Sequence, residues 1–364
     1  MSKAAELAAL IGSQTAQGNK NFVINGAMNV AQRSASVTGL GDGDEGYVTL
    51  DRIRHTAAAS AGRFTSAQTA ISDLPGFLNC LHLDCTTADT SIASSELLVL
   101  EHRMEGQNLQ QLKKGTSSAE RITVSFYMKT NKAFTFMCAL NDYDNNRINT
   151  QQFTTTTDWT RHSITFVGDT TGALGDDSGN SLSVEFYLHA GATYTGGTYS
   201  ANTWQSRQAS DNMRAVGIGS FYDSTDNDIK LTGLQVEIGD VATAFEVEDF
   251  ATTLAKCQRY YQKSYNYSVA PATNTQVGAT YQTTDASGNY ASAGYTHFPV
   301  RMRATPTITS YDFAGNSGKI RGGADNVAVV IQAPSENGFG NYVNNVSSGA
   351  GAGIAIHYEA SAEL

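Results

Sequence analysis

The chain has 364 residues, of which 40% are hydrophobic and only 16% are charged. That length allows two domains and a sizeable buried core, so folding requires neither a disulfide nor a structural metal. A formal net charge of −10 disfavours nucleic acid and anionic lipid as partners. Because charged residues are few while Gly, Thr, Ser and Asn are abundant, we expect an all-β protein.

Targeting signals and metal-binding cysteines are not evident. Residues 1–18 lack a basic region followed by a long apolar run, so we expect no secretion signal. No apolar stretch reaches the about 18 residues that a membrane span needs, so we expect no membrane insertion. The cysteines form no Cys-x-x-Cys pair, which argues against zinc and predicts four free thiols: Cys80, Cys85, Cys138 and Cys257. Free thiols are consistent with assembly in a reducing cytoplasm.

Residues 1–18 form the first predicted unit, a short helix. Leu7, Ala8 and Ile11 recur at helical spacing and form an apolar stripe. A helix of about ten residues is marginal alone in water, so the stripe needs a partner surface. We expect either docking on another protein or packing on the chain's own sandwich.

In residues 19–248 the hydrophobic pattern changes to a period of two residues. Apolar and polar residues alternate over 122–128, 134–140 and 182–188, as in strands with one buried face. Around Gly233 the apolar phase shifts by one residue, which predicts a β-bulge. We expect an antiparallel β-sandwich, interrupted by one short helix at 105–113.

Residues 249–364 predict a second, smaller β domain. A brief helix is expected over 252–263, followed by short strands rich in Tyr and Thr. Strands are also expected at 307–312, 327–332 and 354–358, separated by Gly, Asn and Ser turns. No tandem repeat or sustained heptad pattern is visible, which excludes a solenoid or a long coiled coil.

No catalytic, metal or cofactor site is predicted. The seven histidines are scattered without i, i+4 pairs, and no Gly-x-Ser-x-Gly elbow or phosphate loop occurs. A triad of distant residues leaves no local signal, so the sequence does not exclude one. The segment 142–146 matches the first half of a calcium loop but has Arg147 where glycine is needed, so a hairpin turn is the better interpretation. One structural calcium ion at an unlocated site remains an open alternative.

Aromatic residues among small polar neighbours are the candidate ligand contacts, because a flat ring stacks on the apolar face of a sugar. The sandwich offers three in one Gly- and Thr-rich stretch: Tyr194, Tyr199 and Trp204. The second domain offers five: Tyr281, Tyr290, Tyr295, Phe339 and Tyr342. Filling a trimer interface is the alternative role for the rings of the second domain. Trp159 directly precedes a strand and is expected in the core.

Three stretches together resemble the modular tail-fibre and receptor-binding proteins of tailed bacteriophages. The first is NFVINGAMNVAQR with YVTLDRIR, and the second is LTGLQVEIGDVATAFE with LAKCQRYYQ. The third is HFPVRMRATPT with the terminal YEASAEL. The resemblance covers nearly the whole chain. Ile53 departs from it, since relatives often have Trp there, and we expect only local repacking.

This resemblance implies a jelly-roll sandwich similar to carbohydrate-binding modules, followed by a C-terminal tip domain. It also implies a structural virion component rather than an enzyme, assembled as a homotrimer. The N-terminus would dock on virion tail or portal and adaptor proteins, and the distal half would contact a host-surface glycan or outer-membrane component. A head or collar decoration fibre is the alternative, and a polysaccharide depolymerase is a lesser one, because such tailspikes are commonly built on long β-helices.

Overall fold

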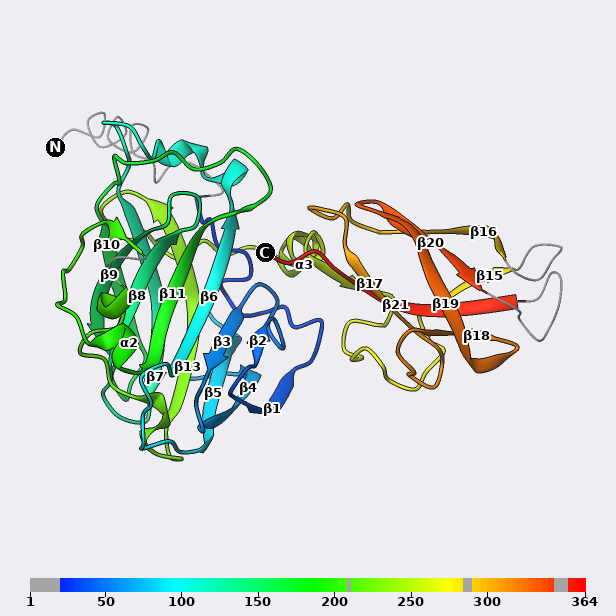
Figure 1. The fold of residues 1–364 in the computed structure, drawn as a ribbon, viewed down its shortest axis with the longest axis horizontal. Coiled ribbons are helices and arrows are strands. Elements are labelled where there is room, and N and C mark those ends of the chain that lie inside the picture. The colour runs from blue at the N-terminus through cyan, green and yellow to red at the C-terminus, as the bar shows by residue number, and fades with distance from the viewer. Residues whose placement is uncertain (1–19, 208–210, 284–289, 344–352) are drawn as a thin grey trace. The chain divides into compact units, whose positions relative to one another are not determined.

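The structure, a computed structural model, describes residues 20–207, 211–283, 290–343 and 353–364. These residues divide into two compact units (Figure 1). The first contains residues 20–29, 35–249 and Leu364, and the second contains residues 30–34 and 250–363. The main division between Asp249 and Phe250 lies next to the expected boundary after residue 248, but 30–34 belong to the second unit.

The first unit is built on two antiparallel sheets. In the described residues, one sheet has six strands in the order β1 (Ser36–Leu40), β4 (Arg63–Ala70), β5 (Asn79–Thr87), β13 (Asp228–Ile238), β7 (Ile122–Thr130) and β10 (Thr160–Phe166). The other has seven, in the order β12 (Gln205–Ser206), β9 (Arg147–Thr154), β8 (Thr135–Asp142), β11 (Asn180–Ala190), β6 (Leu97–Glu105), β3 (Arg54–Ala58) and β2 (Glu45–Gly46).

The sandwich core lies between these sheets because apolar side chains alternate along their strands. Phe126 of β7 has its ring centroid 4.8 Å from that of Phe186 on β11 and 5.1 Å from that of Phe153 on β9. These contacts join the two sheets face to face. The expected antiparallel β-sandwich is therefore confirmed.

The predicted bulge at Gly233 is present. The pairing of β13 with β7 shifts register between Thr232 and Gln235, and Gly233 has φ +64°. A Cβ at this position would lie 2.8 Å from the Phe77 ring. Glycine is therefore required both for the backbone conformation and for the close packing.

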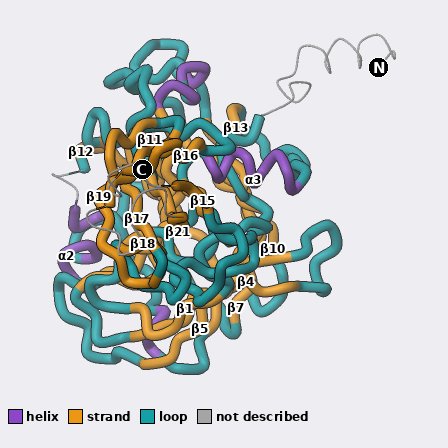
Figure 2. Tube along the Cα trace, turned by 90° about the vertical axis from the view of Figure 1, so that its right-hand side faces the viewer, coloured by secondary structure: helices purple, strands orange, loops and turns teal. Residues whose placement is uncertain are grey.

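Helices in the first unit are short (Figure 2). Where one helix was expected over 105–113, the structure has two 3₁₀ turns, η2 (Gly106–Asn108) and η3 (Gln110–Leu112). The others are α2 (Ala192–Thr195), η4 (Asp211–Met213) and η5 (Phe221–Asp223). Trp159 was expected in the core but is only half-buried, and its indole N–H donates to Asp73 at 2.9 Å. No described helix is long and apolar enough to cross a membrane.

The second unit has an antiparallel sheet of its own, preceded by α3 (Phe250–Gln258). The predicted helix over 252–263 thus ends earlier, and 261–263 form a strand. Within the described residues the main strand order is β14 (Tyr261–Lys263), β21 (Gly353–Ser361), β18 (Lys319–Gly322), β19 (Ala324–Ser335), β20 (Gly338–Val343) and β16 (Tyr290–His297). Both β15 (Thr280–Thr283) and β17 (Thr307–Tyr311) also pair with β21.

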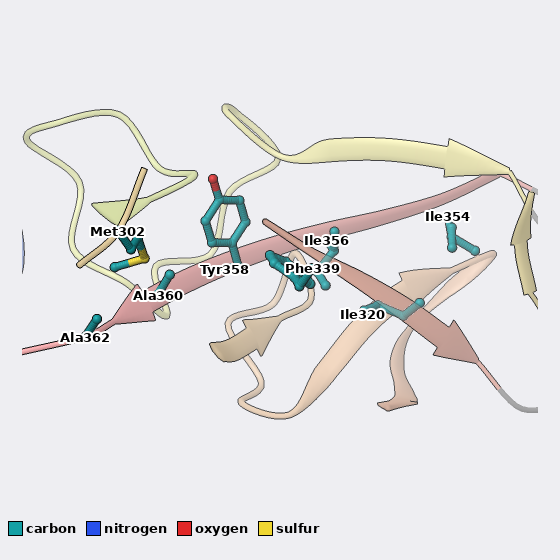
Figure 3. Close-up of a cluster of buried hydrophobic side chains, with 8 residues drawn as sticks. All are labelled: Met302, Ile320, Phe339, Ile354, Ile356, Tyr358, Ala360 and Ala362. Atoms are coloured by element: carbon teal, nitrogen blue, oxygen red, sulfur yellow. The ribbon is translucent and has the colours of Figure 1, made fainter. Parts of the chain in front are cut away.

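The core of the second unit surrounds β21 (Figure 3). Alternate residues of this strand point into it, and the cluster consists of Met302, Ile320, Phe339, Ile354, Ile356, Tyr358, Ala360 and Ala362. The rings of Phe339 and Tyr358 meet edge to face, with centroids 5.2 Å apart. Phe339 is fully buried, so the prediction that it contacts a ligand is wrong.

Candidate functional site

The outer face of the seven-stranded sheet is the main candidate surface of the sandwich. Because side chains alternate, the residues next to inward-facing Phe186 on β11, which are Glu185 and Tyr187, lie on this outer face. Glu101 of β6 is paired directly with Glu185, and Val99 is paired with Tyr187. One half of this face is therefore polar and the other half is apolar.

The apolar half is covered by four residues that follow β11: Tyr194, Tyr199, Ala215 and Ile218. Leu97, Val99, Met137, Ala139, Ile148, Tyr187 and Ala215 form a buried cluster here. Tyr194 and Tyr199 pack against this cluster, and the Tyr199 hydroxyl accepts a hydrogen bond from the Gln152 backbone N–H at 2.9 Å. Both rings are half-buried, so much of each holds the segment on the sheet.

Trp204 is also half-buried and lies outside that cluster. Its indole N–H donates to the Val167 carbonyl at 2.7 Å, and the Lys114 ammonium lies 5.5 Å from its ring centroid. The structure thus brings Tyr194 and Tyr199 together, while Trp204 packs separately within the same segment. All three rings have structural contacts.

The polar half contains two carboxylates that share a tyrosine. The Tyr143 hydroxyl lies 3.2 Å from Glu185 Oε1 and 3.5 Å from Glu101 Oε2. Glu185 also accepts from Asn141, Ser183 and the Tyr187 hydroxyl at 2.7 to 2.9 Å. Burial, reinforced by these carboxylates, raises the pKa of the Tyr143 phenol well above its ordinary value, so the phenol remains a hydrogen-bond donor.

Arginines balance the charge of this polar half. Arg54 binds Glu101 Oε1 at 2.7 Å, and Arg103 binds Glu101 Oε2 at 2.9 Å. The guanidinium carbons of Arg103 and Arg207 lie 5.4 and 5.3 Å from the Tyr143 ring centroid. The result is a largely buried network of donors and acceptors around one aromatic ring, of which Tyr143, Arg103 and Arg207 remain partly exposed.

A second polar arrangement, Ser220–His189–Glu96, was not found from the sequence. His189 Nδ1 lies 2.8 Å from Ser220 Oγ, and Nε2 lies 2.9 Å from Glu96 Oε2. These spacings resemble those of a hydrolase triad. However, Ser220 Oγ also accepts from the Tyr222 backbone N–H at 3.1 Å and caps η5. The three residues lie 124 positions apart at most, so no local motif could have shown them.

The His189 ring is completely buried, and its environment favours the neutral form. Burial lowers its pKa, and the hydrogen bond with Glu96 opposes this only in part. A neutral ring with Nε2–H donating to Glu96 can accept from Ser220 through Nδ1. The arrangement satisfies three polar groups at the edge of the sandwich, and we assign it to the scaffold.

The second unit exposes two of the predicted aromatics. Tyr281 on β15 is 65% exposed and Tyr295 on β16 is 37% exposed. The Tyr295 hydroxyl lies 2.6 Å from Ser335 Oγ, which fixes the ring. Tyr290 and Tyr342 are paired on β16 and β20, but their side chains lie outside what the structure describes. Leu7, Ala8 and Ile11 of the predicted docking helix also lie outside the described residues.

Metal-binding geometry was sought in the same residues. Over 20–207, 211–283, 290–343 and 353–364, no group of three or more His, Cys, Asp or Glu side chains is placed to hold a metal ion. The four cysteines are buried and unbridged.

The fold and these surfaces define a two-unit, all-β protein whose first unit is a β-sandwich. No family model matches the sequence, and no curated protein matches it. Among solved structures it is similar to a family 11 carbohydrate-binding module from Clostridium thermocellum in complex with a mixed-linked tetrasaccharide, with 11% identity and a TM-score of 0.28. That alignment covers 58% of this chain and 99% of the module.

Two further solved structures are similar to the chain with comparably low identities and TM-scores. The enzymatically active domain of tailspike protein 4 from bacteriophage CBA120 is 8% identical, with a TM-score of 0.29, over 60% of this chain and 21% of the tailspike chain. A cellulose-binding domain of a Cellulomonas fimi β-1,4-glucanase is 9% identical, with a TM-score of 0.25, over 52% of this chain and 90% of the domain. Identities and TM-scores this low establish neither homology nor function.

Proposed function

We propose that this protein is a non-catalytic, glycan-binding structural component of a tailed-phage virion, a tail fibre that acts as a homotrimer. The observation that carries the binding part is the exposure of Tyr281 and Tyr295 on two strands of the second unit. An exposed aromatic ring can stack on the apolar face of a sugar. The partly exposed side chains of Tyr143, Arg103 and Arg207 on the sandwich would supply a second, more polar contact.

The virion part of the proposal is supported by the resemblance of six sequence segments to tail-fibre proteins. In this proposal the N-terminal stripe of Leu7, Ala8 and Ile11 docks on a tail or portal protein. The second unit contacts the host surface, and three copies act together. Weak single sites then give useful attachment, because binding at one site raises the effective concentration of the others.

A non-catalytic role is supported by the environment of Glu101 and Glu185, the two carboxylates that share the Tyr143 hydroxyl. Glycosidases need two carboxyl groups free to reach a glycosidic oxygen and a water or anomeric carbon. Glu101 and Glu185 are only 6% and 3% exposed. Each already accepts hydrogen bonds on both oxygens from fixed donors. Neither can reach a sugar without breaking these bonds.

The test is binding of purified full-length protein to an array of bacterial surface polysaccharides. We expect retention on at least one polysaccharide and a loss of at least tenfold with Tyr281→Ser or Tyr295→Ser. Val241→Ser is the matched control, because Val241 is an apolar residue of the sandwich with 71% exposure. Sedimentation of each variant separates the two roles of the rings: a tyrosine variant that dissociates the oligomer places the ring at a subunit interface. No retention on any polysaccharide contradicts the proposal.

The alternative is a head or collar decoration fibre without a receptor role. Immunogold electron microscopy of virions with an antibody against residues 252–364 distinguishes the two. Labelling of the tail is expected here, and labelling of the head or collar favours the alternative.

A further inference from the structure

Lys114 is a buried cation in the sandwich. It follows η3, and its side chain is only 4% exposed. The backbone turns sharply on either side of it, since Lys113 has φ +50° and Gly115 has φ +83°. Lysine is seldom buried unless its charge is compensated, so its surroundings must supply negative charge and acceptors.

Four oxygens surround the Lys114 ammonium. Its Nζ lies 2.5 Å from Asp142 Oδ2 and 3.1 Å from Asp169 Oδ2. It also donates to the carbonyl oxygens of Thr171 and Gly172, each at 2.9 Å. Three N–H donors facing four oxygens are fully used. We call these four oxygens the Lys114 cage.

Neighbouring side chains hold the oxygens of the cage in place. Asn145 donates to Asp142 Oδ1 from its backbone N–H at 3.0 Å and to Oδ2 from its side chain at 3.0 Å. Arg147 binds both oxygens of Asp169, at 2.6 and 3.1 Å. A Cβ on Gly172 would lie 2.2 Å from the Asn145 side chain, so only glycine brings this carbonyl so close. The oxygens are therefore positioned independently of the lysine.

Two carboxylates and two backbone carbonyls are the donor set that a hard divalent cation such as Ca²⁺ takes. Asp142 is also the first residue of the incomplete calcium loop seen in the sequence. In the structure the carboxylate that would begin the loop binds Lys114 instead. A metal ion does not fit beside the ammonium, because both would need the same oxygens.

We propose that Lys114 is a built-in cation that occupies a metal-type site, so that the sandwich is stabilised at this position without calcium. The lysine joins η3, β8 and the 169–172 loop, as a structural metal would. Removing the ammonium while leaving the cage open creates a divalent-cation site.

Two substitutions distinguish the effect of the Lys114 charge from the effect of its side-chain volume. Lys114→Ala empties the cage, and Lys114→Met fills it with an uncharged chain. Both variants leave the buried Asp142 carboxylate without a cation and Asp169 with Arg147 alone, which lowers the Tm by on the order of 10 °C. Millimolar Ca²⁺ should recover most of the loss in Lys114→Ala and little in Lys114→Met. The wild-type Tm should change neither with Ca²⁺ nor with a chelator.

Trp204 allows metal binding in the cage to be measured directly. Its ring centroid lies 5.5 Å from Lys114 Nζ, so a terbium ion at this position accepts excitation energy from the indole. Lys114→Ala should show saturable terbium luminescence that Ca²⁺ displaces, and wild type should show none. Adding Trp204→Phe to Lys114→Ala should abolish the luminescence, whereas Trp159→Phe should not.

If Lys114→Ala does not fold, a double variant still tests the proposal. Lys114→Met combined with Asp142→Asn removes one negative charge along with the positive one, and it should be more stable than Lys114→Met alone. The proposal is overturned if Ca²⁺ stabilises Lys114→Ala no more than Lys114→Met. It is also overturned if the double variant is the less stable one, or if wild type loses stability to a chelator.

Discussion

Acid should unfold the sandwich through two buried histidines. His55 and His102 are each 1% exposed. In the described part of the chain, neither ring nitrogen of His55 has a hydrogen-bond partner. Burial, reinforced by the charge of Arg54, lowers the pKa of His55 to about 4. Burial, reinforced by the charge of Arg52, lowers that of His102 to about 3.

The direction of this pH dependence follows from proton linkage. An unfolded histidine has a pKa near 6.5, so the unfolded state takes up protons first as the pH falls. Stability from the neutral rings is fully present above about pH 6.5 and is lost progressively as the pH falls to about 4 for His55 and about 3 for His102. At pH 5 each histidine costs about 2 kcal/mol, so the two together lower the free energy of unfolding by about 4 kcal/mol relative to pH 7.

Urea unfolding followed by tryptophan fluorescence measures this loss in the sandwich, because Trp159 and Trp204 both belong to the first unit. Replacing His55 by Leu should reduce the loss between pH 7 and pH 5 by about 2 kcal/mol. Replacing the exposed His297 of the second unit should change nothing. A wild-type stability that stays constant from pH 7 to pH 5 would refute the reasoning, as would an unaltered loss in His55→Leu.

Three further predictions concern packing and the triad-like arrangement. Phe126→Ala should cost about 3–5 kcal/mol of unfolding free energy by urea titration, because the ring joins the two sheets; a cost below about 1 kcal/mol would contradict the described core. Gly233→Ala should lower the Tm by several degrees in calorimetry, because of its φ of +64° and the Phe77 ring; an unchanged Tm would argue against the bulge. Ser220 should resist labelling by a fluorophosphonate probe, with chymotrypsin as the positive control; mass-spectrometric detection of a Ser220 adduct would show a nucleophile.

Much of the sandwich could be predicted because its determinants are local. Side chains of a strand alternate between faces, so the apolar residues over 122–128 and 182–188 indicate the side that faces the other sheet, where Phe126 and Phe186 meet. Gly233 could be recognised as a bulge because the phase of alternation changes around it. These features need no knowledge of distant parts of the chain.

The remaining features depend on contacts between distant residues. A short helix was expected over 105–113, but Leu109 and Leu112 are both buried, and their spacing of three suits the 3₁₀ turns that are found. Phe339 lies among glycines and asparagines that suggest a surface loop, yet it packs on Tyr358, 19 residues later. Lys114 and the four oxygens of its cage come from three separate segments of the chain. Sequence spacing contains no signal for such convergence.

The central claim is that this protein binds a glycan and leaves it intact. The most direct measurement is to incubate purified protein with the polysaccharide that it retains and to analyse the recovered polymer by size-exclusion chromatography and a reducing-end assay. We predict bound polysaccharide of unchanged size and no new reducing ends. Shortened chains with new reducing ends would contradict the claim and show a depolymerase.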